Sequence, residues 1–137
     1  MVYYCGSTLI HSKKGVRFLA WSFSNEKAVY IQIAERIRNS ILSGEYPPDG
    51  QIPSVRQLAL ISAVNPNTVQ HAFTELEGEG LIVSKGTQGR FVTDDLSVID
   101  SFKKKAAREL VKQFLEDAKR MSLSKEDIIT MIGDEDV

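Results

Sequence analysis

The sequence has little of what an enzyme or a secreted protein needs. It contains a single cysteine, Cys5, and two histidines, His11 and His71, which lie far apart along the chain. One thiol excludes an internal disulfide framework and fits a reducing compartment. There is no cluster of metal ligands, no nucleophile with a base at motif spacing and no glycine-rich phosphate loop. We therefore expect no enzymatic activity, no metal site and no cofactor.

Long apolar runs and an excess of either charge are also missing. No run approaches the roughly 20 apolar residues of a membrane helix, and the first ten residues lack the basic start and apolar middle of a signal peptide. The 17 Lys and Arg residues nearly balance the 18 Asp and Glu residues, so any binding to nucleic acid must be local. We expect a soluble cytoplasmic protein, whose 137 residues suffice for one compact domain and a modest appendage.

Residues 1–25 show no sustained hydrophobic period. They carry three basic residues, Lys13, Lys14 and Arg17, and no acid. We interpret this segment as a tail, an upstream extension without an assigned role. The alternative is a basic arm that reaches a DNA groove.

Two helices are predicted on either side of a proline-rich turn. Apolar residues recur at every fourth position between residues 27 and 43, which predicts an amphipathic helix; they are Val29, Ile33, Ile37 and Ile41. Residues 44–54, GEYPPDGQIPS, contain three prolines that no helix could cross. Ser54 and Gln57 then form a capping box that begins the second helix. Its short buried face consists of Val55, Leu58 and Ala59.

A third helix is predicted to begin at an Asn-Pro pair. Asn65 is a good N-cap, and Pro66 suits the first helical position because its missing N–H would have had no partner there. One helical stripe is apolar and consists of Val69, Ala72, Phe73 and Leu76. The neighbouring surface carries short uncharged hydrogen-bonding residues: Asn67, Thr68, Gln70, His71 and Thr74. Such residues can approach base edges and phosphates in a major groove, and free amides of the first turn would favour a phosphate.

A short hairpin is predicted directly after this helix. Gly78 and Gly80 end the helix, and two apolar strands follow at residues 81–84 and 90–93, around a turn that contains Gly86 and Gly89. Three helices and a hairpin in this order predict a winged helix-turn-helix domain over residues 26–94. The fold class is therefore mainly α with a small β hairpin, followed by a C-terminal helical segment.

Residues 95–137 are predicted to form two helices with an unpaired apolar stripe. The first would run about 25 residues, or near 37 Å, and the second would begin at the cap Ser124, with Asp127 three residues later. Such a rod cannot bury its own stripe, so we expect a homodimer through these helices. The predicted dimerisation residues are Leu110, Val111, Phe114, Leu115, Ala118 and Met121. The basic run KKKAAR at residues 103–108 is interpreted as a solvated face, with DNA contact as the alternative.

Two stretches carry a resemblance to a known family. YIQIAERIRNSILSGEYPPDGQIPSVRQLA and VNPNTVQHAFTELEGEGLIVSKGTQGRFV resemble the DNA-binding domain of GntR-family bacterial transcriptional regulators, and NPNTV with a short tail is similar to the YtrA-like subfamily. The resemblance implies a transcriptional repressor of a neighbouring operon, such as a transporter operon, that binds double-stranded DNA. The symmetric homodimer expected from the C-terminal helices predicts an inverted repeat as its site. The sequence assigns no particular small-molecule effector, and we expect no membrane partner.

The resemblance also implies which residues contact DNA. The positions that match the family's motif are Arg56, Asn65, Asn67, Thr68, Gln70, Lys85 and Gly86. This sequence departs from the family pattern at Pro66 and Gln70, where arginines often stand. Structural interpretations compete at several positions: Arg56 as a solvated residue, Asn65 as a cap only, and His71 as an exposed helix residue.

The charge balance of the winged-helix domain favours a different function. Residues 26–94 carry six basic and eight acidic residues, whereas DNA-binding domains are typically basic. A winged helix that serves protein contacts is therefore the alternative. The acid-free run 65–74, together with Lys85 and Arg90, favours DNA.

Glutamates at 75, 77 and 79 are unfavourable beside a phosphate, so that end of the helix is expected to point away from DNA.

Overall fold

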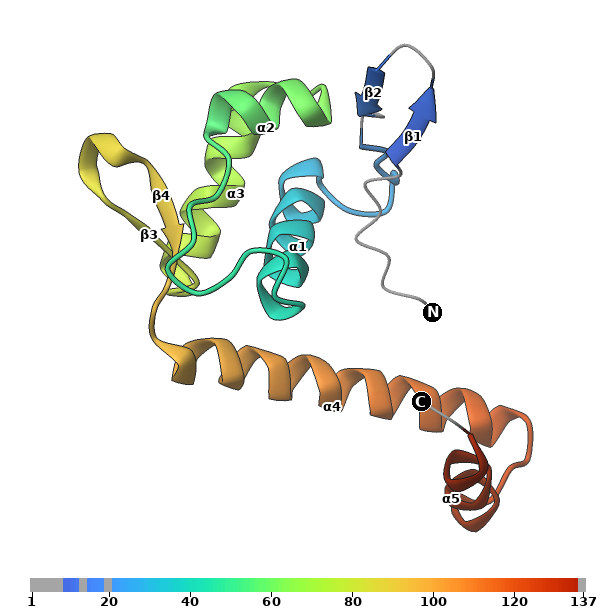
Figure 1. The fold of residues 1–137 in the computed structure, drawn as a ribbon. Coiled ribbons are helices and arrows are strands. Elements are labelled where there is room, and N and C mark those ends of the chain that lie inside the picture. The colour runs from blue at the N-terminus through green and yellow to red at the C-terminus, as the bar shows by residue number, and fades with distance from the viewer. Residues whose placement is uncertain (1–8, 13–14, 19–20, 136–137) are drawn as a thin grey trace. The chain divides into compact units, whose positions relative to one another are not determined.

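The computed structural model describes the backbone of residues 9–12 and 15–18 and the whole of residues 21–135. Figure 1 shows its elements. In chain order they are β1 (Leu9–Ser12), β2 (Gly15–Phe18), α1 (Val29–Leu42), α2 (Val55–Ser62), α3 (Pro66–Gly78), β3 (Ile82–Ser84), β4 (Arg90–Val92), α4 (Leu96–Arg120) and α5 (Lys125–Asp134). The chain divides into two compact units, Met1–Ile99 and Asp100–Val137.

An N-terminal hairpin was not predicted from the sequence. Strands β1 and β2 pair antiparallel, with Leu9 opposite Phe18 and Ser12 opposite Gly15. Each strand is four residues long, and β1, LIHS, has two apolar residues followed by two polar ones, so it lacks the alternation that predicts a strand. Cys5, Lys13 and Lys14 lie outside the described residues.

The segment just before α1 is held against that helix. The Gln32 side chain accepts a hydrogen bond from the backbone N–H of Ser24 and donates one to its carbonyl oxygen, both at 2.9 Å. The Arg36 guanidinium lies 4.8 Å from the Trp21 ring centroid and donates to the carbonyl oxygen of Ser22. Residues 21–25, which the sequence assigned to a tail, therefore contact the winged-helix domain.

Helices α1, α2 and α3 enclose the core of the first unit, and α1 packs on α3. The helix caps match the sequence prediction. Ser54 and Gln57 form the capping box of α2, and Asn65 caps α3 with Pro66 at the first helical position. Most residues of the predicted stripes are buried, and those at most 1% exposed include Ile33, Ile37, Leu58, Val69, Phe73 and Leu76. Val29 and Val55, the first stripe residues of α1 and α2, are only half-buried, because each stands in the first turn of its helix.

The wing contains a third strand-like segment beside the predicted hairpin. Strands β3 and β4 pair antiparallel, with Ile82 opposite Val92, and a 3₁₀ turn joins them. On its other edge β4 pairs with the proline-rich segment: Val92 donates to the carbonyl of Gly50 at 2.9 Å, and Ile52 donates to that of Arg90 at 3.0 Å. Because β4 is held on both edges, the direction of its side chains is fixed.

The second unit contains most of α4 and all of α5. Helix α4 has the predicted length of 25 residues. The cap of α5 is a reciprocal box between Ser124 and Asp127. Among the described side chains of α4 and α5, only Ala118 and Ile128 are buried. These helices therefore leave most of their apolar residues exposed.

Candidate nucleic-acid interface

The start of α3 is closed by its own cap. The Asn65 side chain accepts from the backbone N–H of Asn67 at 2.8 Å, and the N–H of Thr68 donates to the carbonyl of Asn65 at 2.9 Å. Pro66 has no N–H to offer. The prediction that free amides of this turn favour a phosphate is therefore wrong, because the cap occupies them. Recognition at this end must come from side chains.

The polar side chains predicted for this turn lie at the surface. Asn67 and Gln70 are exposed, and Thr68 is half-buried. His71 is also exposed, but its ring stacks on Tyr30 of α1, with centroids 3.7 Å apart and planes 13° apart. No sequence pattern signals this stacking, because Tyr30 belongs to another helix. His71 is therefore held towards α1.

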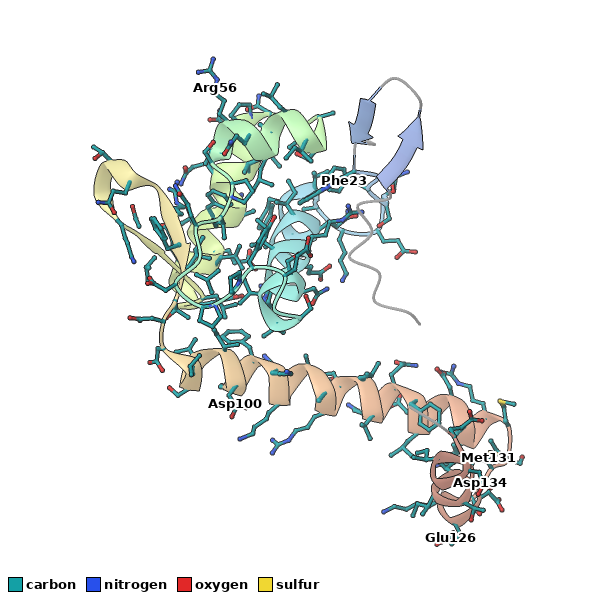
Figure 2. The ribbon with its side chains drawn as sticks, in the orientation of Figure 1. Phe23, Arg56, Asp100, Glu126, Met131 and Asp134 are labelled. Atoms are coloured by element: carbon teal, nitrogen blue, oxygen red, sulfur yellow. The ribbon has the colours of Figure 1, made fainter. Side chains whose placement is uncertain are left out.

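Arg56 lies in the first turn of α2 with an exposed side chain. Figure 2 shows it projecting away from α2 into solvent. Its guanidinium makes no hydrogen bond or ion pair with the described part of the chain. A guanidinium in this position is free to contact a phosphate or a base.

The cation of the wing tip has partners within the chain. Lys85 Nζ lies 2.6 Å from Asp49 Oδ1 and 4.5 Å from the ring centroid of Phe91. Gly86 follows with a φ of +59°, and nothing lies within 4 Å of the position of a Cβ there. Sequence reasoning missed Asp49, which is 36 residues away from Lys85. A phosphate contact by Lys85 must compete with this carboxylate.

Arg90 of β4 joins the wing to α3. Its Nε donates to the Glu77 carboxylate, its Nη2 donates to Gln70 Oε1 at 3.3 Å, and its guanidinium carbon lies 5.0 Å from the Phe73 ring centroid. From the sequence, Arg90 was interpreted as a charge of the hairpin that, with Lys85, favours DNA; its contacts with α3 were not predicted. Its position between strand and helix depends on the pairing of β4.

The acidic end of α3 is neutralised by arginines. Arg38 of α1 pairs with Glu79 and lies 3.6 Å from Glu75, and Arg90 pairs with Glu77. These pairs leave the acidic excess of the domain unchanged, because each glutamate pairs with a basic residue of the same domain, but they place the three glutamates of this helix end in contacts within the chain. The exposed start of α3 keeps its acid-free surface.

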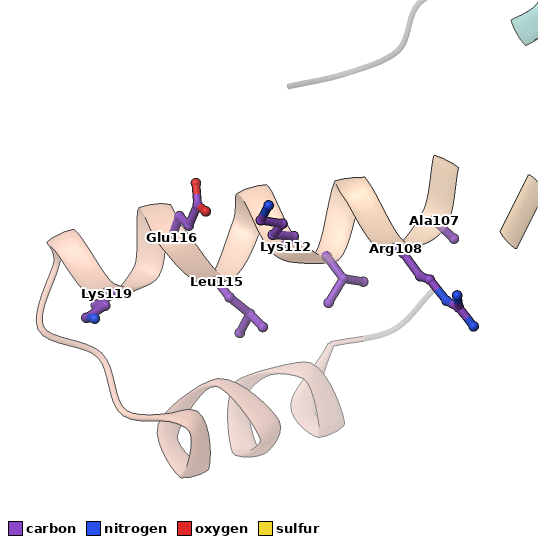
Figure 3. Close-up of a pocket in the computed structure, with 7 residues that line it drawn as sticks. Ala107, Arg108, Lys112, Leu115, Glu116 and Lys119 are labelled. Carbon is purple, nitrogen blue, oxygen red and sulfur yellow. The ribbon is translucent and has the colours of Figure 1, made fainter. Parts of the chain in front are cut away.

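The predicted dimerisation residues are exposed, with one exception. Leu110, Val111, Phe114, Leu115 and Met121 expose between 39% and 73% of their surface. Ala118 is only 4% exposed, where the chain turns back after α4, so it does not belong to the free surface. Figure 3 shows a shallow hollow on α4, lined by apolar Ala107, Val111 and Leu115 and by charged Arg108, Lys112, Glu116 and Lys119.

Neither a metal site nor a membrane span is found within the described ranges. These residues hold no group of three or more His, Cys, Asp or Glu side chains arranged to bind a metal ion. Among the helices of this part of the chain, none combines the length and the apolar character needed to cross a bilayer.

Comparisons with known proteins identify the family. Residues 29–92 match the model of the bacterial regulatory proteins of the gntR family. The chain is 34% identical over 107 residues to the HTH-type transcriptional regulator YhcF of Bacillus subtilis, covering 78% of this chain and 88% of that protein. It is 35% identical over 91 residues to the HTH-type transcriptional repressor YtrA of the same organism, covering 66% of this chain and 70% of YtrA.

A solved structure agrees with this result. The GntR family transcriptional regulator from Listeria monocytogenes superposes with a TM-score of 0.73 at 31% identity, over 83% of this chain and all of that one. The agreement extends beyond the winged-helix domain into the C-terminal helices. This chain therefore belongs to the GntR family of bacterial transcriptional regulators and is similar to YtrA.

Proposed function

We propose that this regulator is a repressor that binds an inverted-repeat operator in double-stranded DNA as a homodimer, with α3 in the major groove. The observation that carries the proposal is the exposed, acid-free start of α3, flanked by the free guanidinium of Arg56 and by the wing tip at Lys85. Polar side chains at a helix start and cations on both sides are what base reading and phosphate binding need.

Each predicted site residue has a role in this proposal. Asn67 and Gln70 read base edges, and Thr68 contacts a phosphate or the edge of the groove. Arg56 contacts DNA from α2. Asn65 acts first as the cap that sets the start of α3.

The wing contributes a non-specific contact. Lys85 meets a phosphate when it exchanges Asp49 for the DNA backbone, and Gly86 lets the backbone of the turn approach closely because no side chain stands there. Such contacts position the protein without reading sequence.

The proposed dimer forms through the exposed apolar residues of α4 and α5. On α4 and just after it these are Leu110, Val111, Phe114, Leu115 and Met121, and on α5 they are Ile129, Met131 and Ile132. Burying each large side chain contributes roughly 1.5 to 3 kcal/mol, so four or five outweigh the entropy of association. Two domains related by a two-fold axis would place their α3 helices about 34 Å apart or a multiple of it.

Regulation is proposed by analogy with relatives. YtrA of Bacillus subtilis is named as a transcriptional repressor, and we propose that this chain represses a neighbouring operon, such as a transporter operon, in the cytoplasm. We assign it no enzymatic activity and no particular small-molecule effector.

A gel shift on the DNA upstream of its own gene tests the proposal. The wild-type chain should shift this DNA at concentrations at least about a thousandfold below those needed for random DNA. Arg56→Ala should weaken the shift. Equal affinity for both DNAs would overturn sequence-specific binding.

One observation favours the alternative of a protein-binding winged helix. Leu60 of α2 is 78% exposed and borders a shallow hollow lined by Tyr46, Ile52, Pro53 and Ile61. Exposed apolar surface of this kind can mark a protein contact. Leu60→Gln should leave DNA binding unchanged if DNA is the partner of this domain.

A further inference from the structure

The outer face of the wing carries a glutamine from the proline-rich segment. Gln51 forms an antiparallel bridge with Phe91 of β4, so the two side chains lie on the same face of the paired strands. Successive residues of a strand point to opposite faces, and the neighbouring Arg90 points towards α3. Gln51 and Phe91 therefore lie on the face of the wing that is turned away from α3.

From this face Gln51 anchors the turn of the wing, residues 85–89. Its amide nitrogen donates a hydrogen bond to the carbonyl oxygen of Gln88 at 2.8 Å, across 37 residues of sequence. Within the turn, the N–H of Lys85 donates to the carbonyl of Gly89 at 2.9 Å, and the N–H of Gln88 donates to the carbonyl of Lys85 at 3.1 Å. These backbone bonds close the turn on itself. The Gln51 bond ties it to the segment that pairs with β4.

The glycine at position 89 fits this anchor. Gly89 has a φ of +107° and a ψ of −154°, a backbone region that is essentially confined to glycine. A Cβ at this position would lie only 3.1 Å from Nε2 of Gln51. The missing side chain of Gly89 therefore permits the backbone of the turn and also leaves room for the Gln51 amide.

The anchor acts where the wing is proposed to meet DNA. When Lys85 exchanges Asp49 for a phosphate, the turn loses its contact with Asp49. The Gln51 contact involves no group that is proposed to bind DNA, so it stays in place in the complex. A loop that becomes ordered only on binding lowers the affinity, whereas a loop that is already ordered in the free protein avoids this cost.

We infer that Gln51 is a positioning residue that orders the wing turn before DNA binds, so that Lys85 and Gly86 reach the DNA backbone at little cost in entropy. The inference rests on the proposed function, because it requires the wing to contact DNA. It adds a residue of the proline-rich segment to the groups that determine DNA affinity. No sequence pattern signals this role, because the acceptor of Gln51 is a backbone carbonyl of a distant residue.

Backbone NMR relaxation of the full chain without DNA is the first test. In the wild type, residues 86–88 should have order parameters of about 0.85, the value of a rigid backbone. Gln51→Met keeps the length of the side chain and removes its donor, so these values should fall below about 0.6, the range of a flexible segment. Values that do not respond to Gln51→Met overturn the inference. Wild-type values already below about 0.6 overturn it without any variant.

Fluorescence anisotropy at several salt concentrations is the second test. Gln51→Met should weaken binding to cognate and random DNA alike by about threefold to tenfold, as expected when one hydrogen bond is removed. The log–log salt slope should remain that of the wild type, because Lys85 still neutralises its phosphate in the complex. Lys85→Ala, in contrast, should reduce the slope. An unchanged affinity, or a slope that falls as in Lys85→Ala, overturns the inference.

Arg38→Lys controls for a general loss of stability. It weakens an arginine–glutamate pair between α1 and the end of α3 and does not touch the wing. The order parameters of residues 86–88 and the affinity for DNA should therefore stay at their wild-type values. If both variants loosen the turn and weaken binding equally, Gln51 has no specific role and the inference is overturned.

These outcomes separate the inference from the proposed function. If the wild-type chain binds no DNA, the proposed function fails and the inference fails with it. If the wild-type chain binds its operator but Gln51→Met neither loosens the turn nor weakens binding, the inference alone fails. Should Gln51→Met not fold, Gln51→Asn replaces it, because its amide is one methylene too short to reach the Gln88 carbonyl. The same loosening and the same loss of affinity are expected there.

Discussion

Arg38 of α1 donates from Nε and Nη2 to the two carboxylate oxygens of Glu79, at 3.0 and 2.5 Å, across 41 residues of sequence. Glu79 is the C-cap of α3, where an anion opposes the helix dipole. The guanidinium offsets this cost and ties α1 to the end of α3. Both side chains are largely buried, with exposures of 19% and 24%.

We expect Arg38→Lys to lower the free energy of unfolding by about 1 to 2 kcal/mol, because a lysine cannot reproduce the two-pronged contact. Urea unfolding followed by circular dichroism measures the change. Lys104→Ala is the control, since its partner Asp100 lies on the same helix and both side chains are well exposed; it should cost less than about 0.5 kcal/mol. Equal losses in the two variants would contradict a special role for Arg38.

Asn67→Ala should weaken the cognate operator by about 1 to 3 kcal/mol and leave random DNA nearly unchanged, because a base-edge contact exists only on the correct sequence. Fluorescence anisotropy with both DNAs measures the two affinities. The Asn65 cap stays in place, since its side chain accepts from the backbone of residue 67. A parallel loss on both DNAs would remove Asn67 from base reading.

Asp49→Asn should strengthen binding to all DNA sequences by up to about fivefold at low salt, because it frees the Lys85 ammonium and removes a nearby anion. Asn also tolerates the left-handed backbone at this position, where φ is +59°. Lys85→Ala should instead weaken binding to all sequences. It should also reduce the log–log salt slope by about 0.9 for each phosphate that is no longer neutralised, one per protomer of the dimer.

Combining the two wing substitutions tests their coupling. In the Lys85→Ala background, Asp49→Asn should lose most of its effect. If the gain from Asp49→Asn persists there and the salt slope of Lys85→Ala is normal, Lys85 does not meet a phosphate.

Replacing Leu110 and Phe114 together by Glu should weaken the proposed dimer by at least about a hundredfold, because two apolar side chains no longer pack across the seam and like charges enter it. Sedimentation at micromolar concentration measures the mass, and circular dichroism checks that α4 stays helical. Ser101→Glu, at an exposed position of α4 outside the stripe, should remain dimeric.

A chain cut after Asp94 should be a folded monomer that binds one half-site weakly. A dimer of that truncated chain would place the interface in the winged-helix domain.

The cap of α5 should weaken in acid. Hydrogen bonds from the Ser124 hydroxyl and then from its backbone N–H hold the pKa of Asp127 below its ordinary value. A lowered pKa means that this stabilisation is complete above the unfolded-state value and is lost as the pH falls through the folded-state value. The NMR amide chemical shifts of residues 125–134 should therefore change as the pH falls through the folded-state pKa of Asp127. Asp127→Asn keeps an acceptor and removes the titration, and an unchanged midpoint in this variant would assign it to another group.

Local chemistry in the sequence determined most of the elements. The cap at Asn65, the proline after it and the box of Ser54 with Gln57 act between residues within one helical turn, so they can be read without a structure. The hydrophobic period then predicted most of the buried face of α1, α2 and α3. The candidate positions in α3 follow from the same stripe, because the exposed polar residues lie beside it.

Tertiary structure alone decided what those positions can contact. The Asn65 cap accepts from an amide that was expected to bind phosphate. The Lys85 ammonium pairs with Asp49, and Arg90 donates a hydrogen bond to the amide oxygen of Gln70. Each of the last two partners is at least 20 residues away in sequence, and each contact depends on the pairing of β4 with its neighbours on both edges. No residue period encodes such pairing, because it arises only when distant segments pack around one core.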